Sequence, residues 1–330
     1  MSAKRKYSLL HPVPGKPLFF HLFKIFHASF LLLLIASSIP ACSDEPENRD
    51  DPRPFIVTTT NFIRDAVEII GDDKVRVISL MGPGVDPHLY RATPGDFQYM
   101  ERSDLIFYNG LFLEGRLSEI LDRMGDKSRA VTGSIPTGKL ISASNYGGTY
   151  DPHVWFDIEL WMHAISDITE VLSEMLPDNR DEFRERKQHY FQELRDLHRY
   201  TLERIRSIPE KRRVLITAHD AFQYFSRAYG IEVRGLQGLS TATEFGIQDV
   251  TNLVSFIIDR QIPAIFVETG VSTRAIESVI TGVRQRGYQV KNGGTLFSDS
   301  MGADGTPEGT YTGMFRHNVD TIVNALTDQN

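Results

Sequence analysis

The chain has 330 residues, with 43 acidic side chains, 36 basic side chains and a single cysteine. One cysteine excludes the internal disulfide framework that stabilises many small secreted domains. A chain of this length can instead bury a large hydrophobic core, divided between two lobes.

The first 41 residues predict an export signal rather than part of the fold. Their only charges are five basic residues, which precede an apolar run at about residues 25–35 and the small residues Ala36-Ser37-Ser38. This order of basic, apolar and small-residue regions is typical of a signal peptide. The apolar run is too short for a confident membrane span, which needs roughly 20 apolar residues.

Cys42 follows Ile39-Pro40-Ala41, and this stretch resembles a bacterial lipobox, in which the cysteine is lipidated and becomes the mature N-terminus. Pro40 departs from that pattern. We predict a lipid anchor at Cys42, with a free thiol beside an ordinary cleavage site as the alternative. Residues 42–54 are polar, acidic and rich in proline, which predicts a flexible tether.

The charge of the exported chain argues against nucleic acid as a partner. Residues 1–41 carry five of the basic residues and none of the acidic ones, so their removal leaves 31 basic and 43 acidic residues, a net charge of −12. Nucleic-acid-binding domains carry basic surfaces instead.

From residue 55 the sequence alternates between strand and helix patterns. Strands are predicted at 55–60, 75–80 and 105–108. Asn61 is the predicted N-cap of a helix that ends at Gly71, and Thr93 precedes a helix opened by Pro94. Such alternation predicts an α/β fold with a parallel sheet, and we assign residues 55–177 to a first lobe.

Residues 178–208 contain no glycine or proline and are dense in charged residues. They predict one long helix of roughly 28 residues, about 42 Å long at 1.5 Å per residue. Its narrow apolar seam predicts a helix that links two lobes; the seam residues are Tyr190, Leu194, Leu197, Thr201 and Ile205.

Strand and helix patterns then alternate again. Strands are predicted at 213–218 and 264–267. Helices are predicted at 221–229, 250–260, 272–286 and 311–326. We assign residues 209–330 to a second α/β lobe.

Four side chains at strand–loop junctions are candidate metal ligands: His88, His153, His219 and Asp299. In parallel sheets ligands bind outside the carboxyl ends of the strands, where these residues or their neighbours fall. Three imidazoles and a carboxylate suffice to hold a divalent transition metal. The sequence Asp-Pro-His occurs at both 86–88 and 151–153, and each aspartate is a predicted partner for the second ring nitrogen of its histidine.

Other chemistries find little support in the sequence. His163, His189, His198 and His317 fall within predicted helices without metalloprotease spacing. Phosphate-binding glycine motifs and the nucleophile-elbow motif are absent from the sequence.

Five motifs together resemble one family. They are Gly-x-Asp-Pro-His (84–88), Asp-Pro-His-Val-Trp (151–155), Thr-Ala-His-Asp-Ala-Phe-x-Tyr-Phe (217–225), Phe-x-Glu (266–268) and Leu-Phe-Ser-Asp-Ser (296–300). From about residue 55 to its C-terminus the chain resembles the TroA-like solute-binding proteins of bacterial metal ABC transporters. The resemblance implies two α/β lobes bridged by one rigid helix, with the metal between them. Carried over residue by residue, it implies His88 and His153 of the first lobe and His219 and Asp299 of the second as ligands.

The resemblance also implies the function. We expect an exported, monomeric, non-enzymatic receptor in the periplasm or at the cell surface, which delivers a metal to an ABC permease and its ATPase. Many manganese and iron receptors of the family have glutamate where this chain has His219, and zinc members often carry a histidine-rich insertion that residues 134–150 lack. Zn²⁺ and Mn²⁺ both fit, and Fe²⁺ fits less well.

Two other functions remain open from the sequence. A secreted zinc metallohydrolase would use Asp299 or Glu268 as general base, since catalytic zinc usually keeps a position open for water. A surface adhesin would use the metal only to stabilise its fold.

Overall fold

The computed structural model describes residues 51–143 and 149–327. The predicted signal peptide, Cys42 and most of the predicted tether lie outside these residues. From Arg53 onward, the described residues form one compact unit. Within 51–143 and 149–327, no helix has both the length and the apolarity that crossing a membrane requires.

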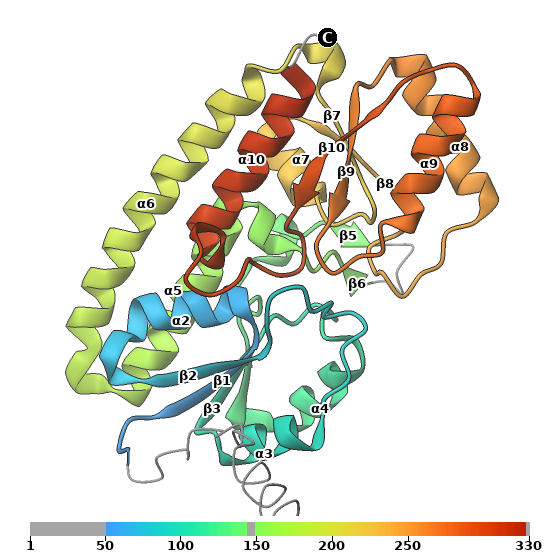
Figure 1. Cartoon of the computed structure of the whole chain (residues 1–330). Coiled ribbons are helices and arrows are strands. Elements are labelled where there is room, and N and C mark those ends of the chain that lie inside the picture. The colour runs from blue at the N-terminus through green and yellow to red at the C-terminus, as the bar shows by residue number, and fades with distance from the viewer. Residues whose placement is uncertain (1–50, 144–148, 328–330) are drawn as a thin grey trace, which may run out of the picture. The chain divides into compact units, whose positions relative to one another are not determined.

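The first lobe is built on a four-stranded sheet in the order β2-β1-β3-β4, with every strand pair parallel (Figure 1). The strands are β1 (Phe55–Thr60), β2 (Arg76–Met81), β3 (Leu105–Tyr108) and β4 (Ser128–Ala130). The helices are α2 (Asn61–Gly71), α3 (Pro94–Arg102), α4 (Ser118–Arg123) and α5 (Ile158–Met175). A short antiparallel hairpin, β5 (Ser142–Ala143) with β6 (Thr149–Tyr150), precedes α5.

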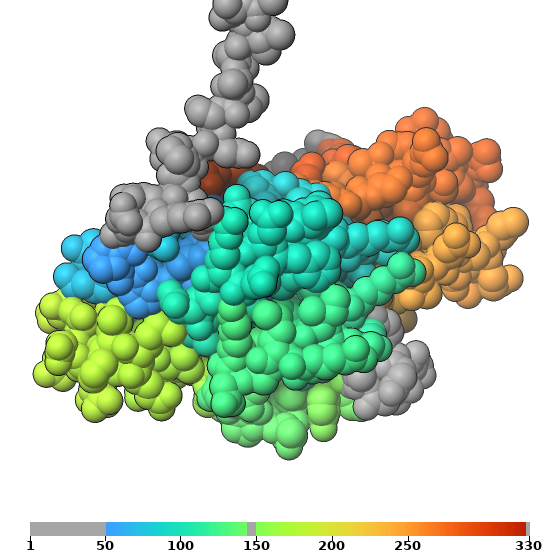
Figure 2. Space-filling model, turned by 90° about the horizontal axis from the view of Figure 1, so that it is seen from below, coloured from blue at the N-terminus to red at the C-terminus, as the bar shows by residue number. Residues whose placement is uncertain are grey.

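Alternate residues of β1 enter different cores, as strand geometry requires. Phe55 and Val57 pack with residues of α3 and α4, whereas Ile56 packs with α2 and α5. The sheet is therefore covered on both faces, which parallel sheets need. Figure 2 shows part of this lobe as a continuous teal surface beside the orange residues of the second lobe.

Helix α6 (Arg180–Arg206) confirms the predicted long helix within two residues at each end. The predicted apolar seam is buried, together with Phe183. The helix packs on α2 and α5 of the first lobe and on α10 (Tyr311–Thr327), so it links both lobes (Figure 1).

The second lobe contains two parallel strand pairs: β7 (Val214–Thr217) with β8 (Glu232–Gly235), and β9 (Ala264–Glu268) with β10 (Lys291–Leu296). Strands β7 and β9 lie next to each other. Its remaining helices are α7 (Gln223–Tyr229), α8 (Ile247–Arg260) and α9 (Arg274–Gln285). The predicted α/β class with parallel strands is confirmed in both lobes.

One hydrophobic core runs through both lobes. In β9, Phe266 packs into the core that contains α2, α5, α6 and α10, whereas Ile265 and Val267 face the core formed with α8 and α9. The second lobe is therefore anchored to the first along one face of its strands.

Two predictions about helix starts have different outcomes. Thr93 caps α3 through a reciprocal pair of bonds with Asp96, as a capping box requires. The assignment of Asn61 as an N-cap is wrong, because α2 begins at Asn61 and Thr60 precedes it. The Asn61 amide oxygen instead accepts a hydrogen bond from the backbone N–H of Met301 at 3.1 Å.

Candidate metal site

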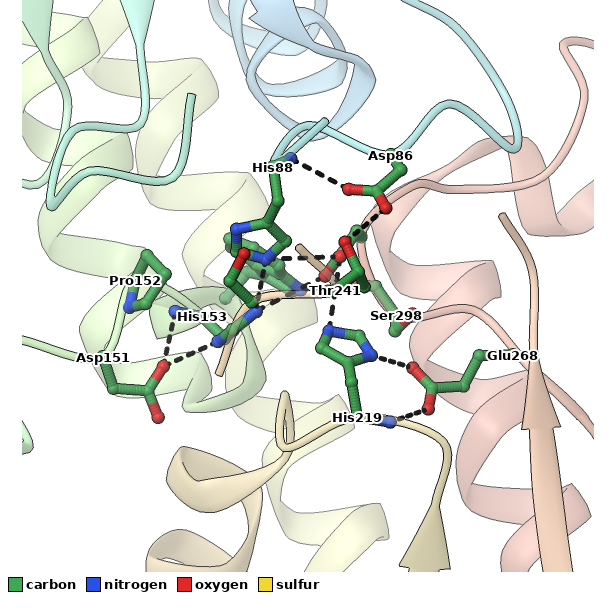
Figure 3. Close-up of polar contacts among 12 residues, drawn as sticks. Asp86, His88, Asp151, Pro152, His153, His219, Thr241, Glu268 and Ser298 are labelled. Carbon is green, nitrogen blue, oxygen red and sulfur yellow. Dashed lines mark hydrogen bonds and ion pairs between the residues drawn. The ribbon is translucent and has the colours of Figure 1, made fainter. Parts of the chain in front are cut away.

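The structure brings all four candidate ligands together. One donor atom from each of His88, His153, His219 and Asp299 lies within 4.8 Å of the other three, and all four residues are buried. Figure 3 shows the three imidazoles gathered from separate segments of the chain. The Nε2 atoms of His88 and His153 are 3.3 Å apart, and the carboxylate of Asp299 lies 3.3–3.6 Å from Nε2 of each histidine. His88 is the most exposed of the four, at 8%.

Strand ends place two of these side chains. His219 lies two residues after β7, and Asp299 lies three residues after β10. His88 lies in the segment between β2 and α3. His153 follows the short hairpin strand β6, so its position depends on packing in the first lobe rather than on the main sheet.

His153 is held by Asp151, as predicted. The Oδ1 atom of Asp151 accepts a hydrogen bond from the backbone N–H of His153 at 2.9 Å and lies 2.7 Å from its ring Nδ1 (Figure 3). Nδ1 can therefore carry the proton, which leaves Nε2 unprotonated and free to bind a metal. Trp155 flanks this ring, and its indole N–H donates to the carbonyl of Ser298 at 3.0 Å.

Glu268 holds His219 in the same way from the end of β9. Its Oε1 accepts from the backbone N–H of His219 at 2.9 Å, and its Oε2 lies 2.7 Å from ring Nδ1 (Figure 3). Both side chains are fully buried. The Phe-x-Glu motif is the sequence signal for this residue, but its pairing with His219 was not predicted. Asp220, beside His219, instead accepts from Gln223 at 2.6 Å.

His88 differs, and the predicted contact of its ring with Asp86 is wrong. Asp86 accepts from the backbone N–H of His88 at 2.9 Å, but its other oxygen accepts from the hydroxyl of Thr241 (Figure 3). Ring Nδ1 of His88 is buried without a hydrogen-bond partner in the described part of the chain. The sequence contained no signal for Thr241.

A strained loop packs on the turn that carries His88. Residues 110–112 have φ values of 83°, 53° and 67°, although two of them are not glycine. Glu114, fully buried, holds this loop by accepting from two backbone N–H groups and from the hydroxyl of Thr59. A Cβ atom at Gly115 would lie 2.9 Å from the carbonyl oxygen of His88, so glycine permits this approach.

The electrostatics favour a cation at the centre. Burial lowers the pKa of His88 to about 3, with His153 and His219 acting in the same direction. Burial also acts to lower the pKa of His219, but Glu268 and Asp299 outweigh it and raise this pKa well above its ordinary value. Burial acts to raise the pKa of Asp299, but the three histidines outweigh it and hold the pKa well below its usual range.

Hydrogen bonds among the described residues do not satisfy all the polar atoms of this centre. Both carboxylate oxygens of Asp299 and Nε2 of His219 are buried without a hydrogen bond among the described residues. Buried polar atoms without partners are costly, and a bound divalent ion would satisfy all three. Imidazole nitrogen and carboxylate oxygen are donors suited to Zn²⁺, and carboxylate also suits Mn²⁺.

Comparisons with known proteins give matches over most of the chain. A model of the family described as ZnuA, zinc-uptake complex component A, periplasmic, matches residues 56–325. Manganese-binding lipoprotein MntA of Bacillus subtilis (strain 168) is 45% identical over 298 residues, covering 89% of this chain and 97% of that protein. Zinc-binding protein TroA of Treponema pallidum (strain Nichols) is 47% identical over 278 residues, covering 84% and 90%.

Solved structures show the same two-lobed fold. The periplasmic zinc-binding protein TroA from Treponema pallidum superimposes with a TM-score of 0.81 over 84% of this chain and 100% of that chain, at 47% identity. Fe(III)-bound YtgA from Chlamydia trachomatis superimposes with a TM-score of 0.75 over 83% and 98%, at 28% identity. The chain therefore belongs to the ZnuA family, the periplasmic A components of zinc-uptake complexes.

Proposed function

We propose that this protein captures one divalent transition metal ion outside the cytoplasmic membrane and delivers it to an ABC permease driven by an ATPase. His88, His153, His219 and Asp299 are the proposed ligands. The observation that carries the proposal is the convergence of four buried donor atoms within 4.8 Å, with both oxygens of the carboxylate otherwise unbonded.

The proposed cargo is Zn²⁺ or Mn²⁺, with Fe²⁺ less favoured. Relatives named for manganese binding and for zinc binding support Mn²⁺ and Zn²⁺ as candidates. A relative solved with bound Fe(III) supports iron as a third candidate. Three imidazoles favour zinc, and sites of this kind bind zinc more tightly than manganese in general. Affinity in vitro therefore does not identify the transported ion.

The protein acts in this proposal as a receptor and not as an enzyme. A catalytic zinc usually has three protein ligands and an open position for water. Here Asp299 lies 3.3–3.6 Å from all three histidines, as a fourth ligand would. Both oxygens of Glu268 contact His219, which argues against a role for Glu268 as a general base.

The proposed location follows from the N-terminal sequence and from relatives named lipoproteins. We infer export, lipidation at Cys42 and a tether over residues 42–54. The proposed division is a first lobe at 55–177, a linking helix at 178–208 and a second lobe at 209–330. A monomer suffices, because one chain supplies all four ligands.

Alanine substitution of each histidine ligand tests the site. His88→Ala, His153→Ala and His219→Ala should each weaken Zn²⁺ and Mn²⁺ binding at least about tenfold in calorimetric titrations, because each removes one of four donors. His189→Ala is the matched control, since its side chain is 81% exposed on α6. Wild-type affinity in any of the three variants removes that residue from the ligand set.

The transported ion needs a separate experiment. The metal content of the protein purified from its own cells should be one equivalent of the physiological ion. A deletion strain should then recover growth with that same ion. Recovery with neither zinc nor manganese would contradict the proposed uptake function.

A further inference from the structure

The two Asp-Pro-His turns have the same local sequence but different contacts. In the turn at 151–153, one carboxylate oxygen of Asp151 contacts both the backbone N–H and the ring Nδ1 of His153. In the turn at 86–88, Asp86 serves only the backbone N–H of His88. Its second oxygen accepts from the hydroxyl of Thr241 at 2.5 Å (Figure 3).

This difference leaves His88 as the least supported of the three imidazoles. His153 and His219 each have a carboxylate oxygen 2.7 Å from Nδ1, whereas Nδ1 of His88 has neither a hydrogen bond nor an ion pair with a carboxylate among the described residues. Carboxylates behind metal-binding imidazoles fix the ring and strengthen the ligand. The position of His88 therefore depends on its backbone turn, which Asp86 holds.

The bond from Asp86 to Thr241 connects the two lobes. Asp86 belongs to the first lobe, and Thr241 lies in the second, between β8 and α8. One further hydrogen bond from this turn crosses to the second lobe, from the backbone N–H of Gly84 to the hydroxyl of Ser300 at 2.9 Å. In this segment Gly84 and Leu89 are exposed, whereas Pro87 and His88 are buried.

The Asp299 loop is held more firmly against the first lobe. Bonds from Trp155 to Ser298 and from Met301 to Asn61, at 3.0 and 3.1 Å, are both buried. The turn of His88 therefore has the most exposed surroundings of the four ligand segments, and its two bonds to the second lobe are only partly buried.

We propose that Asp86 and Thr241 form a latch between the lobes that slows the dissociation of the bound metal. Asp86 is a positioning residue, which acts on the metal through His88. Thr241 holds the free oxygen of Asp86, so the His88 turn moves away only after this bond breaks. The proposal rests on the metal-capture function and concerns how long the metal stays bound.

Thr241→Val tests the latch, because valine keeps the side-chain shape and removes the hydroxyl. The Zn²⁺-loaded full chain is mixed with an excess of a coloured chelator in a stopped-flow instrument. Zn²⁺ should dissociate about tenfold faster from this variant, since the bond lost is to a charged group but lies where water can partly replace it. Thr241→Ser keeps the hydroxyl and should restore the wild-type rate.

Thr243→Val is the matched control, because Thr243 is an exposed threonine in the same segment. It should release Zn²⁺ at the wild-type rate. The absorption spectrum of the Co²⁺ form should be the same in all variants, because the latch leaves the ligand set unchanged. Thr241→Ala provides the same measurement if valine changes this spectrum.

The outcomes separate the latch from the function. A wild-type dissociation rate in Thr241→Val, with one Zn²⁺ bound per chain, overturns the latch and leaves the receptor function standing. Failure of the wild-type protein to bind Zn²⁺ overturns the function itself. Equal acceleration in Thr241→Val and Thr243→Val means that the segment, rather than this hydroxyl, controls release, and also overturns the latch.

Discussion

Replacing Glu268 by glutamine should weaken metal binding without changing the fold. Both oxygens of Glu268 contact His219, one at the backbone N–H and one at ring Nδ1, and both side chains are fully buried. Glutamine has the same size and keeps one oxygen for the backbone N–H. It removes the negative charge behind the imidazole.

The expected loss of metal affinity follows from two opposed effects of that charge. The carboxylate stabilises any positive charge on Nε2 of His219, whether a proton in the metal-free protein or a divalent ion in the loaded one. Since Coulomb energy scales with charge, the divalent ion loses roughly twice as much as the proton when the carboxylate is removed. The net result is weaker binding, by about 10- to 100-fold for carboxylates of this kind, or about 1.4–2.8 kcal/mol.

Competition between the protein and a chelator of known affinity measures this loss. Glu277→Gln is the control, because Glu277 is an exposed glutamate on α9. A second readout is the number of protons released on metal binding, from calorimetry in buffers of different ionisation enthalpy. Glu268 and Asp299 raise the pKa of His219, so Glu268→Gln should release fewer protons at neutral pH. Unchanged affinity together with unchanged proton release would refute the reasoning.

Three further predictions concern pH and packing. Glu268 and Asp299 raise the pKa of His219 well above its ordinary value, so its proton should compete with the metal, and affinity should rise with pH around neutrality. Competition titrations that give a flat profile between about pH 6 and 8 would contradict this. Burial raises the pKa of Glu114 from 4.5 to about 6, so the folded state binds this proton more tightly than the unfolded state. Stability should therefore fall by about 2 kcal/mol as pH rises through that interval, and urea unfolding of Glu114→Gln should lack this change. Leu194→Ala should lower the free energy of unfolding by about 2–5 kcal/mol, because Leu194 is fully buried on α6. Metal affinity should stay unchanged, and a wild-type melting temperature would argue against that packing.

Local periodicity in the sequence predicts most of the secondary structure. The strands at β1, β3, β7 and β9 and the helices α2, α6 and α10 lie within a few residues of their predicted bounds. Their patterns are strong because each strand is buried and each helix has a continuous apolar stripe. Helix α5 and strands β8 and β10 were not predicted, and β10 (Lys291–Leu296) is mostly polar and contains two glycines.

The candidate ligands were also visible in the sequence, because each lies at or near a junction where a regular element ends. The fold brings their donor atoms together from positions up to 211 residues apart, between His88 and Asp299. Parallel strands explain part of this convergence, since their carboxyl ends lie at one edge of each lobe.

Only the tertiary structure determines which side chain lies next to Nδ1 of each imidazole. Asp86 and Asp151 are both followed by Pro-His, yet Asp151 contacts the ring of its own histidine and Asp86 contacts Thr241, 155 residues away. Glu268 reaches His219 only because β7 and β9 lie side by side. Local sequence determines the shape of a turn, but the partner of its free carboxylate oxygen depends on which remote segment packs against that turn, and only the arrangement of the two lobes sets that.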